Sequence, residues 1–379
     1  MAEYVVKIAL GYFYNFILTN LGNVYSCGGN GAGQLGLGDR TNRYTFTKVD
    51  IDNVKDIICG SNHTFILKND NSIWGCGQNG AGQLGLGDNT DKYTFTKVNI
   101  DNVKEVICGG SSTFIIKNDG SIWATGYNYY GQLGLGDTNY RTTFTKVNIN
   151  NVKDIVCGGY YTFILKNDNS VWCCGENDKG ALGLGDNTDR YIFTKVDIDN
   201  VKKVVCGENP TFIIKNDNSV YGCGYYYYGE LGLGDSTNYI NTFTKLNIDN
   251  VKDIVCRPIY TFILKNDGSV YSCGQNSNGQ LGLGDDNDRK TFTKVDIEDV
   301  KEVLCGYRHT FIIKNDGIIY SCGENDDGTL GLGDTTDRNI FTPLTAQLET
   351  LGIEPMPSIT YNYLSSMDVL TELLSFHNL

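Results

Sequence analysis

Histidine, cysteine and paired carboxylates are the residues that could do chemistry in this 379-residue chain. The three histidines do not form a catalytic set. His63 and His309 occupy one slot of an internal repeat in which Tyr, Ser and Pro also occur, and His377 lies near the C-terminus. A catalytic triad or Cys-His pair needs one histidine beside one nucleophile, and no such combination is suggested. Acidic pairs such as Asp326-Asp327 are interpreted as solvated loop residues. We therefore expect no catalytic residues and no enzyme activity.

The thirteen cysteines could form disulfides or a metal site, but they follow the repeat instead. Leu10 and Thr125 stand in at two of the cysteine slots, which a disulfide or metal ligand would not allow, and no C-x-x-C pair is present. Unpaired thiols behave as small buried hydrophobes and suit a reducing compartment. The pattern predicts structural thiols, no metal, no cofactor and a cytoplasmic protein. Twelve of them fall at two periodic slots: Cys59, Cys108, Cys157, Cys206, Cys256 and Cys305, and Cys27, Cys76, Cys174, Cys223, Cys273 and Cys322.

A glycine-rich stretch, GAGQLGLGD at 31–39, returns six more times with little change. A phosphate-binding loop would need a following Lys-Ser/Thr and a helix, and neither is present. The glycines permit positive φ, the leucines can be buried, and the aspartates can accept backbone N–H bonds in turns. We interpret it as a structural loop that joins neighbouring units. Its closing aspartates are Asp39, Asp88, Asp137, Asp186, Asp235, Asp285 and Asp334, at steps of 49 or 50 residues.

Each repeat contains four short β-type runs. In the second unit they are 54–59 (VKDIIC), 64–68 (TFILK), 72–76 (SIWGC) and 93–98 (YTFTKV). A fixed period of this length marks a repeat array, and four short strands per unit are typical of a propeller. The sequence predicts an all-β fold, a seven-bladed propeller with four-stranded blades.

The two ends of the repeat region predict how the ring closes. Residues 4–10 read as a first strand and residues 341–344 as a last one, so we expect Val5-Val6-Lys7 to pair with Phe341-Thr342. Such pairing would leave no open strand edge. The expected propeller spans residues 1–345.

Residues 346–379 read as a linker followed by a short amphipathic tail. Pro355 and Pro357 interrupt the first part, and 365–376 (SSMDVLTELLSF) could form a short helix. Such a helix is too small to be stable alone. It docks on the propeller itself or binds a partner or a second copy; the sequence leaves these alternatives open.

Composition excludes several function classes. The net charge is −13 and the pI is about 4.7, whereas nucleic-acid binding needs a basic surface. No apolar run approaches the length of a membrane span, and the N-terminus does not resemble a signal peptide. We expect no nucleic acid, no membrane and a monomeric protein.

The repeated run that reads CG, HTF, LK, DG, CG and GQLGLGD resembles the regulator of chromosome condensation repeat. The resemblance covers residues 1 to about 345 and all seven copies. It implies a seven-bladed propeller, in agreement with the repeat count. Members of the family include exchange factors for small GTPases, chromatin binders and protein-binding modules, so the resemblance indicates the fold more firmly than the function.

Differences between the repeats gather in the loops after the first and third strands, which leave the same face of a propeller. These loops are rich in Tyr, Asn, Ser and Gly, the residues that antibody paratopes use. We expect the tyrosines of units three to five to form one continuous patch around which Arg257, Arg308 and the 176–179 loop supply polar contacts. The candidate partner-binding residues are Tyr12, Tyr14, Tyr127, Tyr129, Tyr130, Tyr160, Tyr161, Tyr225, Tyr226, Tyr227, Tyr228, Arg257, Tyr260, Tyr307 and Arg308.

The sequence therefore predicts a non-catalytic protein-binding module with a protein partner. The alternative is a guanine-nucleotide exchange factor or regulator of a small GTPase. Exchange factors of this family carry an extra wedge on one blade, whereas here the single added residue, within 236–241, is too short to form one.

Overall fold

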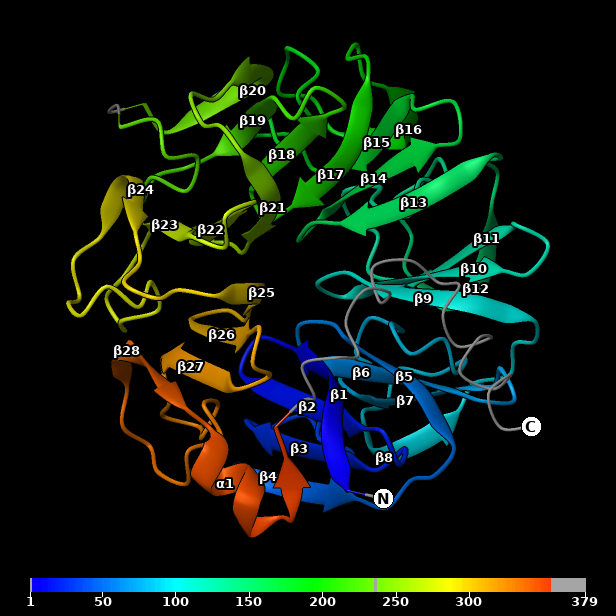
Figure 1. The fold of residues 1–379 in the computed structure, drawn as a ribbon. Helices are drawn as coiled ribbons and strands as arrows, with labels where there is room; N and C mark the ends of the chain where they lie inside the picture. Colours follow the sequence, from blue (N-terminus) through cyan, green and yellow to red (C-terminus); the bar gives the residue numbers. More distant parts are fainter. Residues whose placement is uncertain (1, 235–236, 356–379) are drawn as a thin grey trace, which may run out of the picture.

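The computed structural model describes residues 2–234 and 237–355. These residues form seven sheets arranged as blades around a central axis (Figure 1); six have four strands, and the first has a fifth strand from the end of the described chain. Each blade contains four strands that follow one another in the chain. The predicted seven-bladed propeller is confirmed.

The strands occupy equivalent places in every blade. The first strands are β1 (Glu3–Leu10), β5 (Val54–Cys59), β9 (Val103–Cys108), β13 (Val152–Cys157), β17 (Val201–Cys206), β21 (Val251–Cys256) and β25 (Val300–Cys305). The second strands are β2 (Tyr14–Thr19), β6 (His63–Lys68), β10 (Ser112–Lys117), β14 (Tyr161–Lys166), β18 (Pro210–Lys215), β22 (Tyr260–Lys265) and β26 (His309–Lys314). The third strands are β3 (Val24–Gly28), β7 (Ile73–Gly77), β11 (Ile122–Gly126), β15 (Val171–Gly175), β19 (Val220–Tyr225), β23 (Val270–Gly274) and β27 (Ile319–Gly323). The fourth strands are β4 (Arg43–Val49), β8 (Lys92–Lys97), β12 (Arg141–Val147), β16 (Arg190–Lys195), β20 (Tyr239–Lys245), β24 (Arg289–Lys294) and β28 (Arg338–Pro343).

The hydrophobic core lies between adjacent blades. Between blades two and three, Phe65 and Leu84 pack against Val103 and Ile115, and each neighbouring pair of blades has a similar cluster. The second strands are almost wholly buried because they have a strand on either side and a neighbouring blade on either face. Burial of such side chains stabilises the fold by about 1.5–3 kcal/mol each.

The GLGD loop connects each blade to the next. In the first unit Leu35 is fully buried, Leu37 forms a β-bridge with Thr94 of the next blade, and the Gly38 N–H donates to Tyr93 O at 2.8 Å. Gly36 has φ of +70°, and a Cβ there would lie 2.4 Å from the Phe95 ring. Only glycine fits at this position.

The closing aspartates hold the same loops in shape. Asp39 accepts hydrogen bonds from the Thr41 N–H (2.9 Å) and Asn30 Nδ2 (3.1 Å), and pairs with Arg43 at 2.6 Å. The Arg43 hydrogen bond contributes most to lowering the pKa of this carboxyl. Asp235 lies outside the described residues. The other closing aspartates with an ion pair to a Lys or Arg four residues on are Asp88, Asp137, Asp186, Asp285 and Asp334.

The ring closes through strands from both ends of the chain, but not through the expected residues. Residues 353–354 form β29 (Ile353–Glu354), which pairs in parallel with Glu3 and Tyr4 of β1. The expected pairing of Val5-Val6-Lys7 with Phe341-Thr342 is wrong, because Thr342 belongs to β28 and pairs with Ser321 of its own blade. The seventh blade has all four of its strands without the N-terminus. The pairing between the two ends of the described chain is instead that of β29 with β1, at the edge of blade one.

The segment after the seventh blade packs on blade one. Helix α1 (Thr345–Thr350) and β29 occupy part of the stretch predicted as a linker. Leu348 and Ile353 are buried in one cluster with Val5 and Ile8. Among the described residues, no helix is long and apolar enough to cross a membrane. The expected tail segment 365–376 lies outside the described residues, and the boundary near residue 345 stays a prediction.

All thirteen cysteines are free, and nine of them are buried. Burial raises the pKa of the Cys59 and Cys305 thiols to about 12. These thiols are therefore protonated at neutral pH and act as small hydrophobic side chains.

Candidate protein-binding face

The loops after the first and third strands leave the same edge of each blade. In blade one, Leu10 lies opposite Asn15, Tyr14 opposite Gly28, and Gly28 opposite Arg43. The short loop 11–13 and the long loop 29–42 therefore start side by side. The variable loops of all seven blades form one face, which we call the variable-loop face.

Four tyrosines predicted for this face are buried, and for them the prediction of exposed contact residues is wrong. Tyr14, Tyr161 and Tyr260 begin second strands, and their hydroxyls donate to backbone carbonyls of the next blade. For Tyr161 the acceptors are Pro210 O at 2.9 Å and Gly207 O at 3.2 Å. Tyr226 is buried in the core between blades five and six. These side chains join blades and are not available to a partner.

His63 and His309 occupy the same slot as the buried tyrosines. Their Nε2 atoms lie 3.1 Å from Thr113 Oγ1 and 2.8 Å from Asn15 Oδ1 of the next blade. Burial lowers the pKa of His63 to about 4 and that of His309 to about 3, so both rings are neutral at pH 7. In the described part of the chain, no group of His, Cys, Asp and Glu is placed to hold a metal ion.

Removing the Tyr161 hydroxyl is expected to weaken the junction between blades four and five. Tyr161→Phe removes the side-chain donor to the buried Gly207 and Pro210 carbonyls, and Pro210 O keeps only the Gly207 N–H (2.8 Å). We expect a cost of about 1–3 kcal/mol in unfolding free energy. Chemical denaturation followed by circular dichroism measures this change. The matched control is Tyr160→Phe, whose side chain is 44% exposed and which should change stability by less than about 0.5 kcal/mol. Equal effects of the two variants would contradict the assignment.

Five tyrosines of blades three and four form one surface cluster, the blade 3–4 cluster, in which Tyr129, Tyr140 and Tyr160 are exposed and the other two are half-buried. Tyr127 lies at its centre, with ring centroids 4.7 Å from Tyr140 and 5.6 Å from Tyr160. Tyr130 bridges Tyr129 (5.1 Å) and Tyr160 (5.3 Å). Tyr129 is 60% exposed. Such a cluster offers a large contact area that is already ordered by its own ring contacts.

Two smaller aromatic clusters lie elsewhere on this face. The blade 5 cluster consists of Tyr225, Tyr227 and Tyr228, with Tyr227 stacked on Tyr225 at 6.3 Å. Among described residues no ring contact joins it to the blade 3–4 cluster. The 176–179 loop carries charge beside both clusters: Glu176 and Asp178 act on Tyr130, and Lys179 acts on Tyr225. The predicted single continuous patch is therefore wrong: there are two tyrosine clusters with charged residues near them.

The third cluster joins the first and last blades. The rings of Tyr12 and Phe13 lie 5.0 and 5.2 Å from Tyr307. Arg308 lies over Tyr307, with Cζ 5.3 Å from its centroid, and its Nη1 is 3.9 Å from Glu324 Oε1. Arg257 makes no ring contact with this cluster among the described residues, but it lines the mouth of the central channel together with Tyr12.

Carboxyl groups with raised pKa lie around these aromatic clusters. Burial, helped by Asp178 and Asp189, raises the pKa of Glu176 to about 7. Burial also raises the pKa of Glu208 to about 7, although the Arg257 charge opposes that rise. The charge of the variable-loop face therefore changes close to neutral pH.

Tyr140 and Glu208 belong to this face but were missed in the sequence. Tyr140 occupies the slot of Asn42, Asp91 and Asp189, whose side-chain oxygens accept a backbone N–H of the same loop. A tyrosine in a slot that otherwise holds Asn or Asp in these units was the signal that could have identified it. Glu208 could have been found as the acidic residue in an otherwise uncharged loop position.

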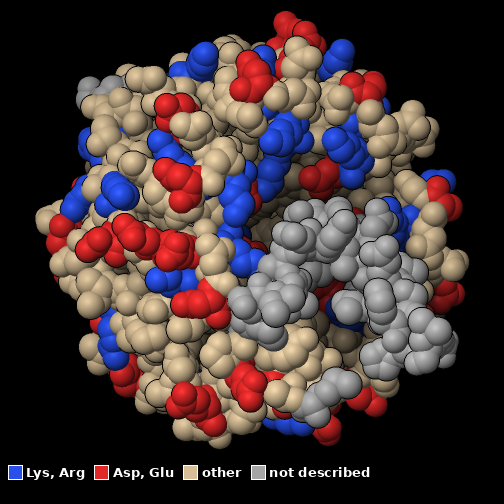
Figure 2. Space-filling view, viewed as in Figure 1, with Lys and Arg blue, Asp and Glu red and all other residues tan. Residues whose placement is uncertain are grey.

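The charges drawn in Figure 2 are mixed. In the part of this view that the described residues form, several Lys and Arg side chains lie beside the central opening, and Asp and Glu side chains lie around them.

Comparison with protein families gives matches along most of the chain. The model of the RCC1-like domain matches residues 1–248. Two models of the regulator of chromosome condensation (RCC1) repeat match residues 267–313 and 300–329. These ranges include repeats from all seven blades.

Solved structures with the same fold include yeast and human proteins. The yeast RCC1 protein Prp20 bound to Kap60 has a TM-score of 0.76 and 20% sequence identity, covering 90% of this chain and 84% of that one. Human WBSCR16 has a TM-score of 0.76 and 20% identity, covering 85% and 94%. At this identity the likeness supports the fold alone.

A curated relative matches over a short stretch. The mouse X-linked retinitis pigmentosa GTPase regulator is 39% identical over 64 residues, which are 16% of this chain and 6% of that protein. The chain thus covers a small part of this relative's length. The family match rests instead on the model that spans 248 residues and on the seven blades, and it shows that this chain belongs to the RCC1-like domain family.

Proposed function

We propose that this protein is a non-catalytic binding module that holds a protein partner on its variable-loop face. The observation that carries the proposal is the gathering of exposed, mutually packed tyrosines at one edge of neighbouring blades. Tyr129 and Tyr227 are 60% and 53% exposed. Tyrosine supplies large contact area at a small cost in rotamer entropy, and exposed aromatic clusters of this kind usually mark an interaction site.

The opposite face supports the same proposal by its uniformity. Its turns repeat a single plan, in which Lys68 lies over Trp74 at 4.7 Å and Asp70 accepts the Ser72 N–H at 2.9 Å. Lys117 and Lys166 lie over the equivalent tryptophans of their own blades at 4.7 and 4.3 Å. These repeated contacts stabilise the turns, and this role is enough to explain why the same residues recur. A partner recognised there would meet similar surfaces on several blades.

Regulation of a small GTPase is the second candidate. It is favoured by the relative named a GTPase regulator and by Prp20p of Saccharomyces cerevisiae, whose structure was reported with its binding to Gsp1p and histones. Against nucleotide exchange, no blade has a strand beyond its four within the described residues, apart from β29 at the edge of blade one. We expect no acceleration of labelled nucleotide release across a panel of small GTPases; a clear catalytic acceleration would favour this candidate.

Cross-linking to a captured partner tests the binding face. The full chain is used to purify partners from its native host, and the complex is treated with a lysine-reactive cross-linker and analysed by mass spectrometry. Cross-links to Lys179, whose side chain is 48% exposed in the variable loops, are expected. Cross-links confined to Lys68, Lys117 and Lys166 would place the partner on the opposite face and contradict the proposal.

A further inference from the structure

One residue at the channel mouth breaks the sevenfold repeat. The slot directly after the first strand holds glycine in six blades and Arg257 in blade six. A binding site for a single group must break the symmetry of a repeat protein, because equivalent blades would otherwise offer equivalent sites. The six glycines are Gly11, Gly60, Gly109, Gly158, Gly207 and Gly306.

The architecture favours glycine at this slot. A Cβ at Gly11 would lie 2.0 Å from the Tyr14 ring, and a Cβ at Gly306 would lie 2.0 Å from the His309 ring. Blade six nevertheless keeps the same turn, in which the Arg257 N–H donates to Tyr260 O at 3.0 Å. The Tyr260 hydroxyl still donates to His309 O at 2.6 Å. The turn therefore has the same backbone hydrogen bond with arginine as with glycine, and it does not depend on the arginine side chain.

The guanidinium of Arg257 is held at the mouth of the channel. Its Nε–H donates to Cys305 O of blade seven at 2.6 Å. Its terminal nitrogens have no hydrogen bond within the described residues. Burial raises the pKa of Cys59 to about 12 and that of Glu208 to about 7, and the Arg257 charge opposes both shifts. Because these groups belong to blades two and five, the charge of Arg257 acts across the channel.

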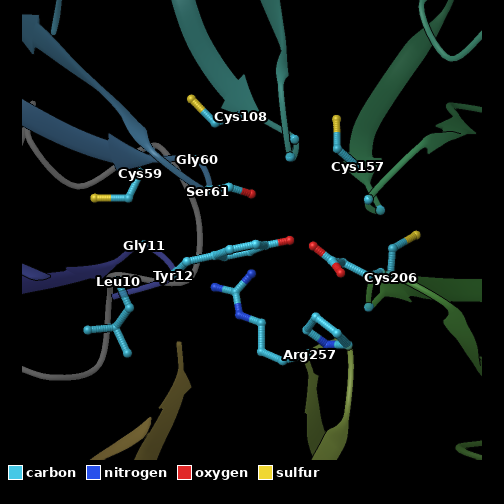
Figure 3. Close-up of a pocket in the computed structure, with 17 residues that line it drawn as sticks. Leu10, Gly11, Tyr12, Cys59, Gly60, Ser61, Cys108, Cys157, Cys206 and Arg257 are labelled. Atoms are coloured by element: carbon cyan, nitrogen blue, oxygen red, sulfur yellow. The ribbon is translucent and has the colours of Figure 1, made fainter. Parts of the chain in front are cut away.

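Hydroxyl groups surround this charge. The Tyr12, Ser61 and Arg257 side chains extend into the same opening (Figure 3), which has a volume of about 40 Å³. The surrounding loops are tied together, since the Tyr12 N–H donates to Ser61 O at 3.2 Å and the Tyr307 N–H to Tyr12 O at 3.1 Å. The opening is thus small, polar and fixed by backbone contacts between blades.

We propose that the channel mouth binds one carboxylate group through the guanidinium of Arg257. A guanidinium matches a carboxylate in shape and charge and can bind it with two parallel hydrogen bonds. The carboxylate comes either from an acidic side chain of a docked polypeptide or from a free carboxylic acid. A carboxylate from a docked polypeptide would extend the proposed function, and that possibility rests on the proposed function. Binding of a free carboxylic acid does not depend on it.

Glu208 couples this site to pH. A bound carboxylate repels ionised Glu208, so binding favours its protonated form and weakens as pH rises through about 7, the pKa of Glu208. The other groups that face it keep their charge in this range. The thiols of Cys59 and Cys206, which line the same opening, stay protonated because burial raises their pKa.

The test uses the full chain labelled with [15N]arginine. The chain contains eight arginines, so the Nε–Hε signal of Arg257 can be assigned from its loss in Arg257→Gly, which restores the repeat residue. Two carboxylate ligands are titrated into the protein: acetate, and an acetylated, amidated pentapeptide with a central glutamate. Their controls are acetamide and the same peptide with glutamine in place of glutamate. Each ligand is added to about 0.1 M so that weak, millimolar binding can be detected. We expect saturable shifts of the Arg257 signal with acetate or the glutamate peptide, and at least tenfold weaker binding of the two amides. Glu208→Gln should tighten binding at about pH 8 and remove its pH dependence.

The two titrations distinguish a polypeptide carboxylate from a free carboxylic acid. Tighter binding of the glutamate peptide than of acetate indicates a polypeptide ligand, and the reverse order a free acid. If neither carboxylate shifts the Arg257 signal, or if the two amides shift it as strongly as the carboxylates do, the site does not exist as proposed. Because these probes need no partner, such a failure leaves the tyrosine-mediated binding to be judged by its own variants.

Discussion

Replacing Tyr129 and Tyr160 with alanine is expected to weaken binding of the protein partner by roughly 10³-fold. Interface anchors of this type cost about 2 kcal/mol or more each when truncated, and each 1.4 kcal/mol is tenfold in affinity. Both side chains are exposed, at 60% and 44%, so the melting temperature should barely change. Both rings contact Tyr130, so the two losses need not add, and the single variants must be measured as well. Isothermal titration calorimetry with the purified partner gives the affinities.

The matched control lies on the opposite face. Asp70→Ala and Asp119→Ala remove an acceptor for the backbone N–H two residues on and leave the variable loops unchanged. We expect affinity within about twofold of the wild type, because surface changes away from the contact usually cost less than 0.5 kcal/mol. Loss of binding in these variants, together with full binding by the tyrosine variants, would place the partner on the opposite face.

Neighbouring tyrosines show how far the sequence could predict this site. Tyr160 and Tyr161 are adjacent, yet they are 44% and 1% exposed. Tyr161 begins a second strand, and the tyrosines and histidines that begin second strands contact the next blade through their side chains, as His63 and His309 do. Alignment of the repeats within the sequence places Tyr161 at the same position as His63 and His309. Composition alone treated both tyrosines as surface residues.

The fold was more predictable because its determinants repeat. The buried positions of Phe65 and Leu84 return in every unit, so one local pattern, read seven times, specifies the whole ring. Features that occur once had no such support. The pairing of Glu3 with Ile353 joins residues 350 positions apart, and no periodicity relates them. Likewise, the contact of Tyr140 with Tyr127 depends on the path of a long loop.

Deleting residues 1–10 is expected to lower the melting temperature greatly. The deletion removes β1, which pairs with β2 along its length and with β29 at its start. It also removes Val5, Ile8 and Leu10 from the cluster that joins the last blade to the first. Burying three such side chains contributes about 5–9 kcal/mol, which is comparable with the whole stability of a typical domain, about 5–15 kcal/mol. Thermal unfolding followed by circular dichroism measures the loss.

Val6→Lys is the control that separates the loss of the strand from a change in its surface. In the other six blades this slot holds lysine, as at Lys55 and Lys104. Val6 is only partly buried against its cluster, and the aliphatic stem of a lysine can cover the same surface while its amino group reaches water. The variant should therefore unfold within a few degrees of the wild type, since about 1 kcal/mol shifts the melting temperature of a large domain by roughly 2–4 °C. If the shortened chain melts like the wild type, β1 is not needed to hold the seventh blade against the first. If Val6→Lys is as destabilising as the deletion, the stability of this junction depends on the Val6 side chain alone. The stabilisation would then be wrongly attributed to β1 as a whole.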